Sequence, residues 1–316
     1  MGYGLLAGLF WGLDTVVIGV ALAMSPFLDT TQAIFLSPFI STFVHDFFSS
    51  IWMLGYMGIK KQYKNVYSAL KSRSGKFIVL AALIGGPVGM TGYVLSIKYI
   101  GASYTAIISS MFPALGAFFA YLFLKEKMKP YQLVGLAVSI LGVIALGYTP
   151  SGTAGDNMLI GITFALVCVV GWASEAVIIA YGLKDPNISD DQALQIRQVT
   201  SAVFYAMIIL PLLGGWGLTL DIFTKSTVFF IMASAVFGTA SYLCYYRAIG
   251  RIGASKAMAL NITYSAWAVV FGVVFLNERM TGNDIFFGVV IILGSIVAAA
   301  DFKEMFGSGN KKKNVA

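Results

Sequence analysis

The sequence predicts an all-α, multi-pass membrane protein, and three observations lead to that prediction. Charged residues make up only 11% of the 316 positions and hydrophobic residues 58%, with a mean hydropathy of +0.83. A soluble domain carries about 25% charged residues. Apolar runs recur along the chain at the length of about 20 residues that a helix needs to cross a bilayer. The Lys and Arg residues gather in alternate connections, as in membrane proteins of fixed topology.

We expect ten transmembrane helices, most of them joined by short connections. The first run begins at Tyr3 with no basic stretch before it and no cleavage site after it, so it is expected to stay as a helix. The segment 59–75 is expected to form a helix on the membrane surface, because apolar side chains recur there at helical spacing between lysines. The ten expected spans are 3–24, 32–58, 76–97, 102–124, 130–148, 157–183, 192–213, 227–249, 254–276 and 283–300.

The basic residues predict the orientation of these spans. If the N-terminus is cytoplasmic, the cytoplasmic connections and the tail hold seventeen Lys and Arg, whereas the outer connections hold three. Cytoplasmic loops of membrane proteins carry the excess of positive charge. Both termini are therefore expected to be cytoplasmic, and the basic pI of about 9.2 reflects membrane topology rather than nucleic-acid binding.

The chain also repeats itself. Segment 99–128 and segment 251–280 share IGAS and then the pattern Phe-Leu-x-Glu-basic-Met at a constant offset of 152 residues. Both halves also open on Trp-x-x-acid, in WGLDTVV (11–17) and WASEAVI (172–178). We expect a first five-helix repeat in 1–150, a second in 151–303 and a flexible tail in 304–316. An odd number of spans per repeat inverts the second repeat relative to the first, an architecture typical of secondary transporters.

These motifs resemble a known family. IGAS followed by FLKEK and FLNER, in a five-plus-five arrangement, is similar to the EamA-like members of the drug/metabolite transporter superfamily over nearly the whole chain. A closer likeness is to the bacterial choline importers of the LicB type. It is carried by GLLAGLFWGL (4–13), VHDFFS (44–49), GGPVGM (85–90), GWASEAV (171–177), ALQIRQVTS (193–201), SYLCYY (241–246) and LNITYSAW (260–267). The resemblance implies import of choline or a related quaternary ammonium across a bacterial plasma membrane by alternating access.

Glu175 is the only carboxylate in its apolar run and lies three residues after Trp172. Residues at i and i+3 share one face of a helix. An acid within the hydrocarbon region costs about 2.5–3.5 kcal/mol and therefore faces the protein interior or a cavity. An indole and a carboxylate on one face favour a cationic ligand. The competing interpretation is that Trp172 packs helices together while Glu175 pairs with Arg197.

Trp11 and Asp14 repeat this spacing in the first span. Two such faces from related helices are expected to form opposite walls of one cation site. The alternative for Asp14 is a hydrogen bond to a neighbouring helix, within a charge or proton network.

His45, Asp46 and Arg197 are the other ionisable residues expected within the spans. Neighbouring helical residues point about 100° apart, so His45 and Asp46 do not both face one small ligand. They are predicted either to relay protons or to form a structural pair, with Asp46 bound to Arg197. Arg197 is expected to pair with Glu175, Asp46 or carbonyl groups. If it instead holds a substrate carboxylate, the protein exports amino acids or aromatic metabolites.

Aromatic residues of the eighth and ninth spans complete the predicted site. A quaternary ammonium has no N–H group, so a cage of aromatic rings around a carboxylate recognises it. Such stripes more often serve packing, and only their convergence with Trp11 and Trp172 favours a cage. Asn261 is expected to hold the hydroxyl group of choline. The candidates in these spans are Tyr242, Tyr246, Asn261, Tyr264 and Trp267.

The sequence shows no pattern typical of an enzyme. It contains no nucleophile placed with a base, no nucleotide-binding motif and only one histidine, so neither a cofactor nor a metal is expected. The Gly-rich run 85–90 lies inside a span and is expected to allow close packing or a broken helix. The expected partners are the lipid bilayer and the small cation, and the oligomeric state is left open, a monomer included.

Overall fold

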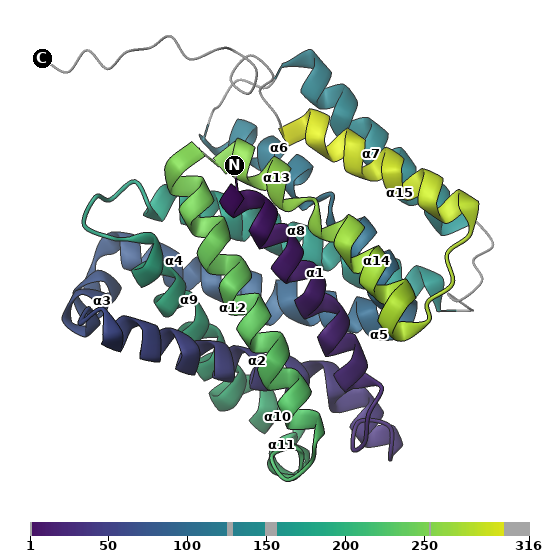
Figure 1. Cartoon of the computed structure of the whole chain (residues 1–316). Coiled ribbons are helices and arrows are strands. Elements are labelled where there is room, and N and C mark those ends of the chain that lie inside the picture. Colours follow the sequence, from purple (N-terminus) through teal and green to yellow (C-terminus); the bar gives the residue numbers. More distant parts are fainter. Residues whose placement is uncertain (1, 125–128, 149–156, 253, 300–316) are drawn as a thin grey trace, which may run out of the picture.

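The computed structural model describes residues 2–124, 129–148, 157–252 and 254–299, and every regular element within these ranges is helical. The all-α prediction is therefore confirmed for this part of the chain (Figure 1). The elements are α1 (Gly2–Leu22), α2 (Thr31–Ile59), α3 (Tyr63–Lys71), α4 (Arg73–Leu83), the π-helix η1 (Ile84–Met90), α5 (Thr91–Ser109), α6 (Phe112–Leu124), α7 (Pro130–Tyr148), α8 (Met158–Gly182), α9 (Asp190–Phe204), the π-helix η2 (Tyr205–Ile209), α10 (Leu210–Leu213), α11 (Trp216–Ile222), α12 (Thr227–Ile252), α13 (Ala254–Asn261), α14 (Tyr264–Leu276) and α15 (Gly282–Ala299).

Six helical stretches in the described ranges are long and apolar enough to cross a membrane, so the chain is a multi-pass membrane protein. They are Gly2–Leu22, Thr31–Ile59, Arg73–Ser109, Met158–Gly182, Asp190–Leu213 and Thr227–Ala248. Four further apolar helices are shorter than this criterion requires: Phe112–Phe123, Pro130–Leu146, Tyr264–Leu276 and Gly282–Ala298. The expectation of ten full-length spans is thus met in part.

Two of the expected spans are interrupted, which explains part of this difference. The expected span 102–124 is divided between the end of α5 and α6, and the expected span 254–276 is divided between α13 and α14. Pro113 follows the first break, where its missing N–H cannot continue the hydrogen bonding of the preceding turn. Broken helices at membrane depth are tolerated where protein or a cavity surrounds the exposed backbone.

The helices that build the centre of the molecule come from both halves of the chain. Helix α1 packs against α12 and α14, and α8 packs against α5, α6 and η1. Helix α2 lies between α9 and α12, whereas α7 and α15 pair with each other at one side of the bundle (Figure 1). Residues far apart in the sequence therefore meet along α1 and α8, which carry the two Trp-x-x-acid stretches.

The Gly-rich run forms the π-helix η1 and brings its backbone unusually close to α8 and α9. A Cβ atom built on Gly85 would lie 1.9 Å from Oε2 of Glu175, and one on Gly89 would lie 2.7 Å from the Trp172 ring. A Cβ on Gly86 would lie 2.1 Å from the Ser201 hydroxyl. The expectation of close packing is confirmed here, because only glycine leaves room for these side chains.

Helix α5 is kinked at Gly101, and a carboxylate from the other half of the chain caps the turn that follows the kink. Gly101 adopts φ 81° and ψ 171°, a conformation that residues with a Cβ rarely adopt. The break exposes the first N–H groups of the following turn, as at any helix start. The Glu278 carboxylate accepts them, at 2.7 Å from Ala102 N and 3.0 Å from Ser103 N.

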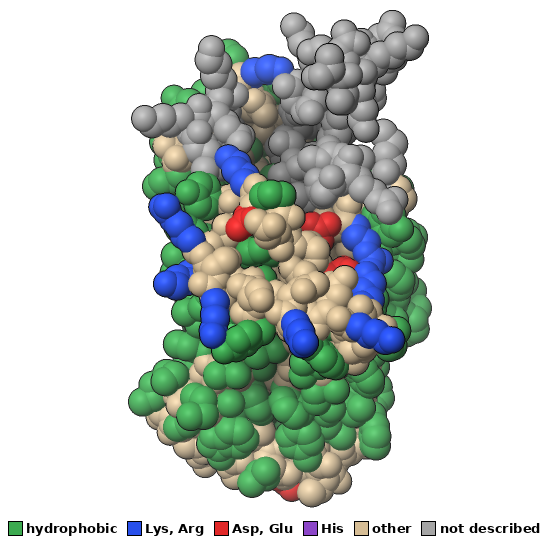
Figure 2. Space-filling model, turned by 90° about the vertical axis from the view of Figure 1, so that its left-hand side faces the viewer, with side chains coloured by type: hydrophobic (Ala, Val, Ile, Leu, Met, Phe, Trp, Pro, Cys, Tyr) green, Lys and Arg blue, Asp and Glu red, His purple; other side chains and the backbone are tan. Residues whose placement is uncertain are grey.

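Basic side chains gather at one end of the bundle. We call this surface, which includes Lys60 and Arg247, the basic end. Figure 2 shows Lys and Arg side chains bordering a largely polar area, with hydrophobic side chains covering the surface beside it. Ion pairs join three helices there: Lys60 Nζ lies 2.5 Å and Arg247 Nη2 3.6 Å from the Asp191 carboxylate. The hydrogen bond that Lys60 donates to the Asp191 carboxylate raises the pKa of Lys60. The segment expected to lie on the membrane surface contains the helix α3, with Tyr63 and Tyr67 exposed.

Candidate functional site

A cavity lies between the two halves of the chain and is lined by residues of α1, α6, α8, α12, α13 and α14. About 550 Å³ of space not occupied by atoms, its open mouth included, lies between its walls. Its lining residues are Trp11, Phe112, Trp172, Glu175, Ala176, Ile179, Ser241, Tyr242, Tyr245, Tyr246, Asn261 and Tyr264. We call it the central cavity.

Aromatic rings meeting edge to face form most of its walls. The Trp11 ring lies with its centroid 5.3 Å from that of Trp172 and 5.3 Å from that of Tyr242, at interplanar angles of 78° and 85°. Phe112 meets Trp172 at 5.8 Å and 86°. Perpendicular rings present both faces and edges to the enclosed space, and the electron-rich faces attract cations.

Glu175 supplies the only carboxylate of the central cavity and is also held by Arg197. The Nε of Arg197 donates to Oε1 of Glu175 at 3.1 Å, and both side chains are buried. Arg197 Nη2 donates to the Tyr242 hydroxyl at 3.1 Å, and the guanidinium lies 4.7 Å from the centroid of that ring. Nη1 donates to Gln198 at 2.9 Å and lies 3.6 Å from Asp46. All three nitrogens of Arg197 are therefore engaged.

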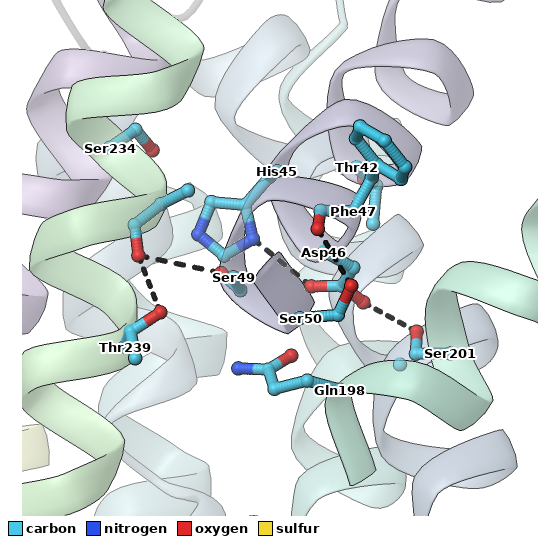
Figure 3. A network of polar contacts seen from close by, with 12 residues as sticks. Thr42, His45, Asp46, Phe47, Ser49, Ser50, Gln198, Ser201, Ser234 and Thr239 are labelled. Atoms are coloured by element: carbon cyan, nitrogen blue, oxygen red, sulfur yellow. Dashed lines mark hydrogen bonds and ion pairs between the residues drawn. The ribbon is translucent and has the colours of Figure 1, made fainter. Parts of the chain in front are cut away.

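The charge network continues away from the cavity through α2 to α1 and α12. His45 Nδ1 lies 3.0 Å from Asp46 Oδ1, and His45 Nε2 lies 3.3 Å from Asp14 Oδ1. Figure 3 shows how Asp46 points towards Ser201 of α9 while His45 points towards α12. Ser234 of α12 donates a hydrogen bond to Asp14. Asp14, His45 and Asp46 thus form a buried network that does not line the central cavity.

This network holds three carboxyl groups, one guanidinium group and one imidazole. With the carboxylates of Asp14, Asp46 and Glu175 ionised, three negative charges face the positive charge of Arg197 and the imidazole of His45. The net charge is therefore −1 with His45 protonated and −2 with His45 neutral. Burying an uncompensated charge costs several kcal/mol, on the order of 3–5 when one partner of a buried pair is missing. With all three carboxyl groups ionised, a cation in the cavity would offset this excess.

Polar groups of the central cavity offer hydrogen bonds as well. Among the described residues, the Tyr245 hydroxyl and Asn261 Oδ1 have no hydrogen-bond partner although both are buried. Buried polar atoms are nearly always paired, so such exceptions indicate a missing water or ligand. Both atoms belong to lining residues.

Most of the sequence-predicted aromatic residues meet in the cavity, and Trp267 does not. Trp11, Trp172, Glu175, Tyr242, Tyr246, Asn261 and Tyr264 all line it. Trp267 is 40% exposed and stacks on Phe271 at 5.8 Å instead. Its Cβ packs next to Gly12 of α1, and the ring points away from the cavity. We therefore leave Trp267 out of the site.

Sequence reasoning missed several lining residues. Phe112, Ile179, Ser241 and Tyr245 were not predicted, although Tyr245 lies within the tyrosine cluster of α12. The signal near Phe112 is Pro113, since proline is common in the first turn of a helix and marks the start of α6. Gly85 and Gly89 act indirectly by giving Glu175 and Trp172 space.

Comparison with known proteins assigns the family. The model of the EamA-like transporter family matches residues 1–148 and again 159–300. The chain belongs to the EamA-like transporter family. Protein LicB of Haemophilus influenzae, which is similar to this EamA-like chain, is 35% identical over 218 residues, covering 69% of this chain and 73% of that protein. The resemblance to LicB expected from the motifs is thereby confirmed.

Other similar proteins agree with this assignment. An uncharacterized transporter of Clostridium kluyveri is 29% identical over 245 residues, covering 75% of this EamA-like chain and 74% of that protein. A solved crystal structure shares the fold with a TM-score of 0.61 at 16% identity, covering 94% of this chain and 95% of the other. The chain is thus a membrane transporter of the drug/metabolite transporter superfamily by family membership.

Proposed function

We propose that the protein imports choline or a closely related quaternary ammonium, bound in the central cavity. The observation that carries this proposal is the combination of perpendicular aromatic rings with Glu175 and a buried network in which carboxyl groups outnumber cationic groups. A quaternary ammonium is recognised through π faces and negative charge, with a desolvated cation–π contribution of about 2 kcal/mol or more. The hydroxyl group of choline has partners in Tyr245 and Asn261.

The alternative, export of an amino acid or aromatic metabolite, needs a cation to hold the substrate carboxylate. Arg197 is the candidate for that role, and its nitrogens already donate to Glu175, Gln198 and Tyr242. Its side chain is 1% exposed. A carboxylate would also meet the excess negative charge of the network. These observations favour a cationic substrate over one that carries a carboxylate.

For the mechanism we infer alternating access between two inverted five-helix repeats, 1–150 and 151–303. The pairing of helices supports it: α1 packs against α12 much as α8, its counterpart by the sequence repeat, packs against α5. The basic end is expected to be cytoplasmic, with both termini on that side. An inside-negative membrane potential then favours entry of a monovalent cation by about 2.3 kcal/mol per 100 mV.

Calorimetric titration of the purified protein with choline, betaine and phenylalanine tests the proposal directly. We expect choline to bind and zwitterionic betaine to bind much more weakly, because its carboxylate cancels the net charge that the network favours. Binding of phenylalanine without binding of choline would contradict it. Uptake of labelled choline into proteoliposomes then distinguishes transport from binding alone.

A further inference from the structure

Helix α8 separates the central cavity from a second hollow on its opposite face. Trp172, Glu175, Ala176 and Ile179 line the central cavity. Ser174, Val177, Ile178 and Tyr181 follow the same i, i+3, i+4, i+7 spacing two residues later and line the other hollow, which we call the lateral crevice. A shift of two residues turns the side-chain direction by about 200° around the helix axis, so the two stripes face nearly opposite directions.

The lateral crevice is apolar and lies between α4, η1, α6 and α8. About 910 Å³ of space lies between its walls and mouth, and its other lining residues are Phe77, Ile84, Phe119 and Phe123. No lining residue is charged, and Ser174 contributes the only aliphatic hydroxyl. Phe123 is 72% exposed and Tyr181 41% exposed. These walls suit a hydrocarbon chain rather than a polar solute.

Basic side chains lie close to lining residues of the lateral crevice. Lys184 Nζ lies 6.0 Å from the centroid of the Tyr181 ring, which meets the Phe77 ring at 4.9 Å and 73°. Lys76 directly precedes Phe77 and is exposed, as is Lys184. The nearest acid in the sequence, Asp185, accepts hydrogen bonds from the backbone and side-chain nitrogens of Asn187, both at 3.0 Å. Lys184 and Lys76 outnumber the one neighbouring carboxylate, Asp185, so these three side chains carry a net charge of +1 beside lining residues of the crevice.

We propose that the lateral crevice is a binding site for one anionic phospholipid, whose acyl chain enters between α4, α6 and α8 while its phosphate lies between Lys76 and Lys184. Basic pockets between transmembrane helices bind anionic lipid headgroups in this manner. A cationic substrate passing through the crevice would instead meet repulsion from both lysines. Since α8 carries Trp172 and Glu175 on its other face, the bound lipid supports the wall of the central cavity.

Native mass spectrometry of delipidated protein with added phosphatidylglycerol or phosphatidylcholine tests this site. We expect one phosphatidylglycerol per chain to bind in preference to phosphatidylcholine. The double variant Lys76→Gln/Lys184→Gln is expected to bind it about 30-fold more weakly, equivalent to about 2 kcal/mol for two lysines. Val177→Trp, which fills the crevice, is expected to abolish the tight binding.

The matched control is Lys64→Gln/Lys71→Gln, which removes the same charge from α3. If this control loses as much phosphatidylglycerol as the Lys76/Lys184 variant, the lipid is held by the general charge of the basic end and the proposal is wrong. Equal binding of both lipids by the native protein would overturn it too. If Val177→Trp does not fold, the two lysine variants alone decide between a defined site and diffuse attraction.

Discussion

Trp11 and Asp14 on α1 have the same spacing as Trp172 and Glu175 on α8, but the two pairs meet different surroundings. The two tryptophans converge on one cavity with their ring centroids 5.3 Å apart. Glu175 remains in that cavity and binds Arg197, whereas Asp14 turns away from it towards Ser234 and His45. In both repeats the tryptophan of the motif therefore lines the central cavity, whereas the acid lines the cavity in one repeat and joins the buried charge network in the other.

Local packing accounts for the difference. Helix α12 lies directly on α1 and supplies the Ser234 hydroxyl, so the short Asp14 side chain is satisfied without reaching the cavity. Helix α8 faces the π-helix η1, where Gly85 leaves space for the longer Glu175 side chain. The spacing of a motif therefore predicts which residues share a helix face, while the neighbouring helix decides what each of them binds.

The strongest test of this comparison neutralises each acid in turn. Glu175→Gln is expected to weaken choline binding about 100-fold or more, because it removes the only carboxylate of the cavity, a loss of about 2.7 kcal/mol. Asp14→Asn is expected to change the affinity less than tenfold. Titration calorimetry on both variants measures this. The reverse order of effects would mean that Asp14 is the acid that serves the site.

The next largest loss of choline affinity is expected when each tryptophan is replaced with leucine. Trp11→Leu and Trp172→Leu are each expected to raise the Kd for choline about 30-fold, the equivalent of a desolvated cation–π contribution of about 2 kcal/mol. Trp267→Leu is the control, since that ring points outwards. Equal losses in all three variants would show that packing, rather than ring contact with the cation, explains the effect.

The glycines that face the two acids allow a subtler test. A Cβ at Gly85 would lie 1.9 Å from Glu175, and one at Gly238 would lie 2.7 Å from His45 and 3.1 Å from Asp14. Gly85→Ala is therefore expected to displace the Glu175 carboxylate and weaken choline binding about tenfold, about 1.4 kcal/mol. Gly238→Ala is expected to cost about 1–3 kcal/mol of stability by overpacking, with little change in affinity.

Measuring both the melting temperature and the affinity of these two glycine variants separates the roles. Gly55→Ala is the matched control, because a Cβ there meets nothing within 4 Å. A loss of choline affinity in Gly238→Ala comparable to that in Gly85→Ala would contradict the conclusion that Glu175 serves the cavity while Asp14 belongs only to the buried network.

The smallest expected effect concerns the hydroxyl group of choline. Asn261→Leu and Tyr245→Phe are each expected to weaken choline binding about fivefold, since one hydrogen bond contributes about 1 kcal/mol. Tetramethylammonium has no hydroxyl group, so its affinity is expected to stay unchanged in Tyr245→Phe. Parallel titrations with the two cations measure the ratio, and an equal loss for both would assign Tyr245 to the aromatic cage only.

Much of this arrangement was predictable because membrane insertion imposes strong patterns on a sequence. The helices, α3 among them, and the convergence of Trp11 with Trp172 follow from hydropathy, charge and repeat spacing. The turn of Asp14 towards His45 and the outward direction of Trp267 depend on which helix packs alongside. Pro113 and the Gly-rich run mark the break before α6 and the position of η1 in the sequence, whereas the break before α14 and the π-helical form of η1 arise from tertiary packing, which periodicity does not encode.

The hydrogen bonds from the helix start after Gly101 to Glu278 make the N-terminal half of the chain depend on its C-terminal half. The carboxylate lies in the second half of the chain, and the amide groups of Ala102 and Ser103 that it caps lie in the first. A fragment ending before residue 150 would lack the carboxylate that caps this helix start, and loss of a side-chain cap costs about 0.5–2 kcal/mol. An N-terminal half expressed alone is therefore expected to be less stable than one whose C-terminal half is made alongside it.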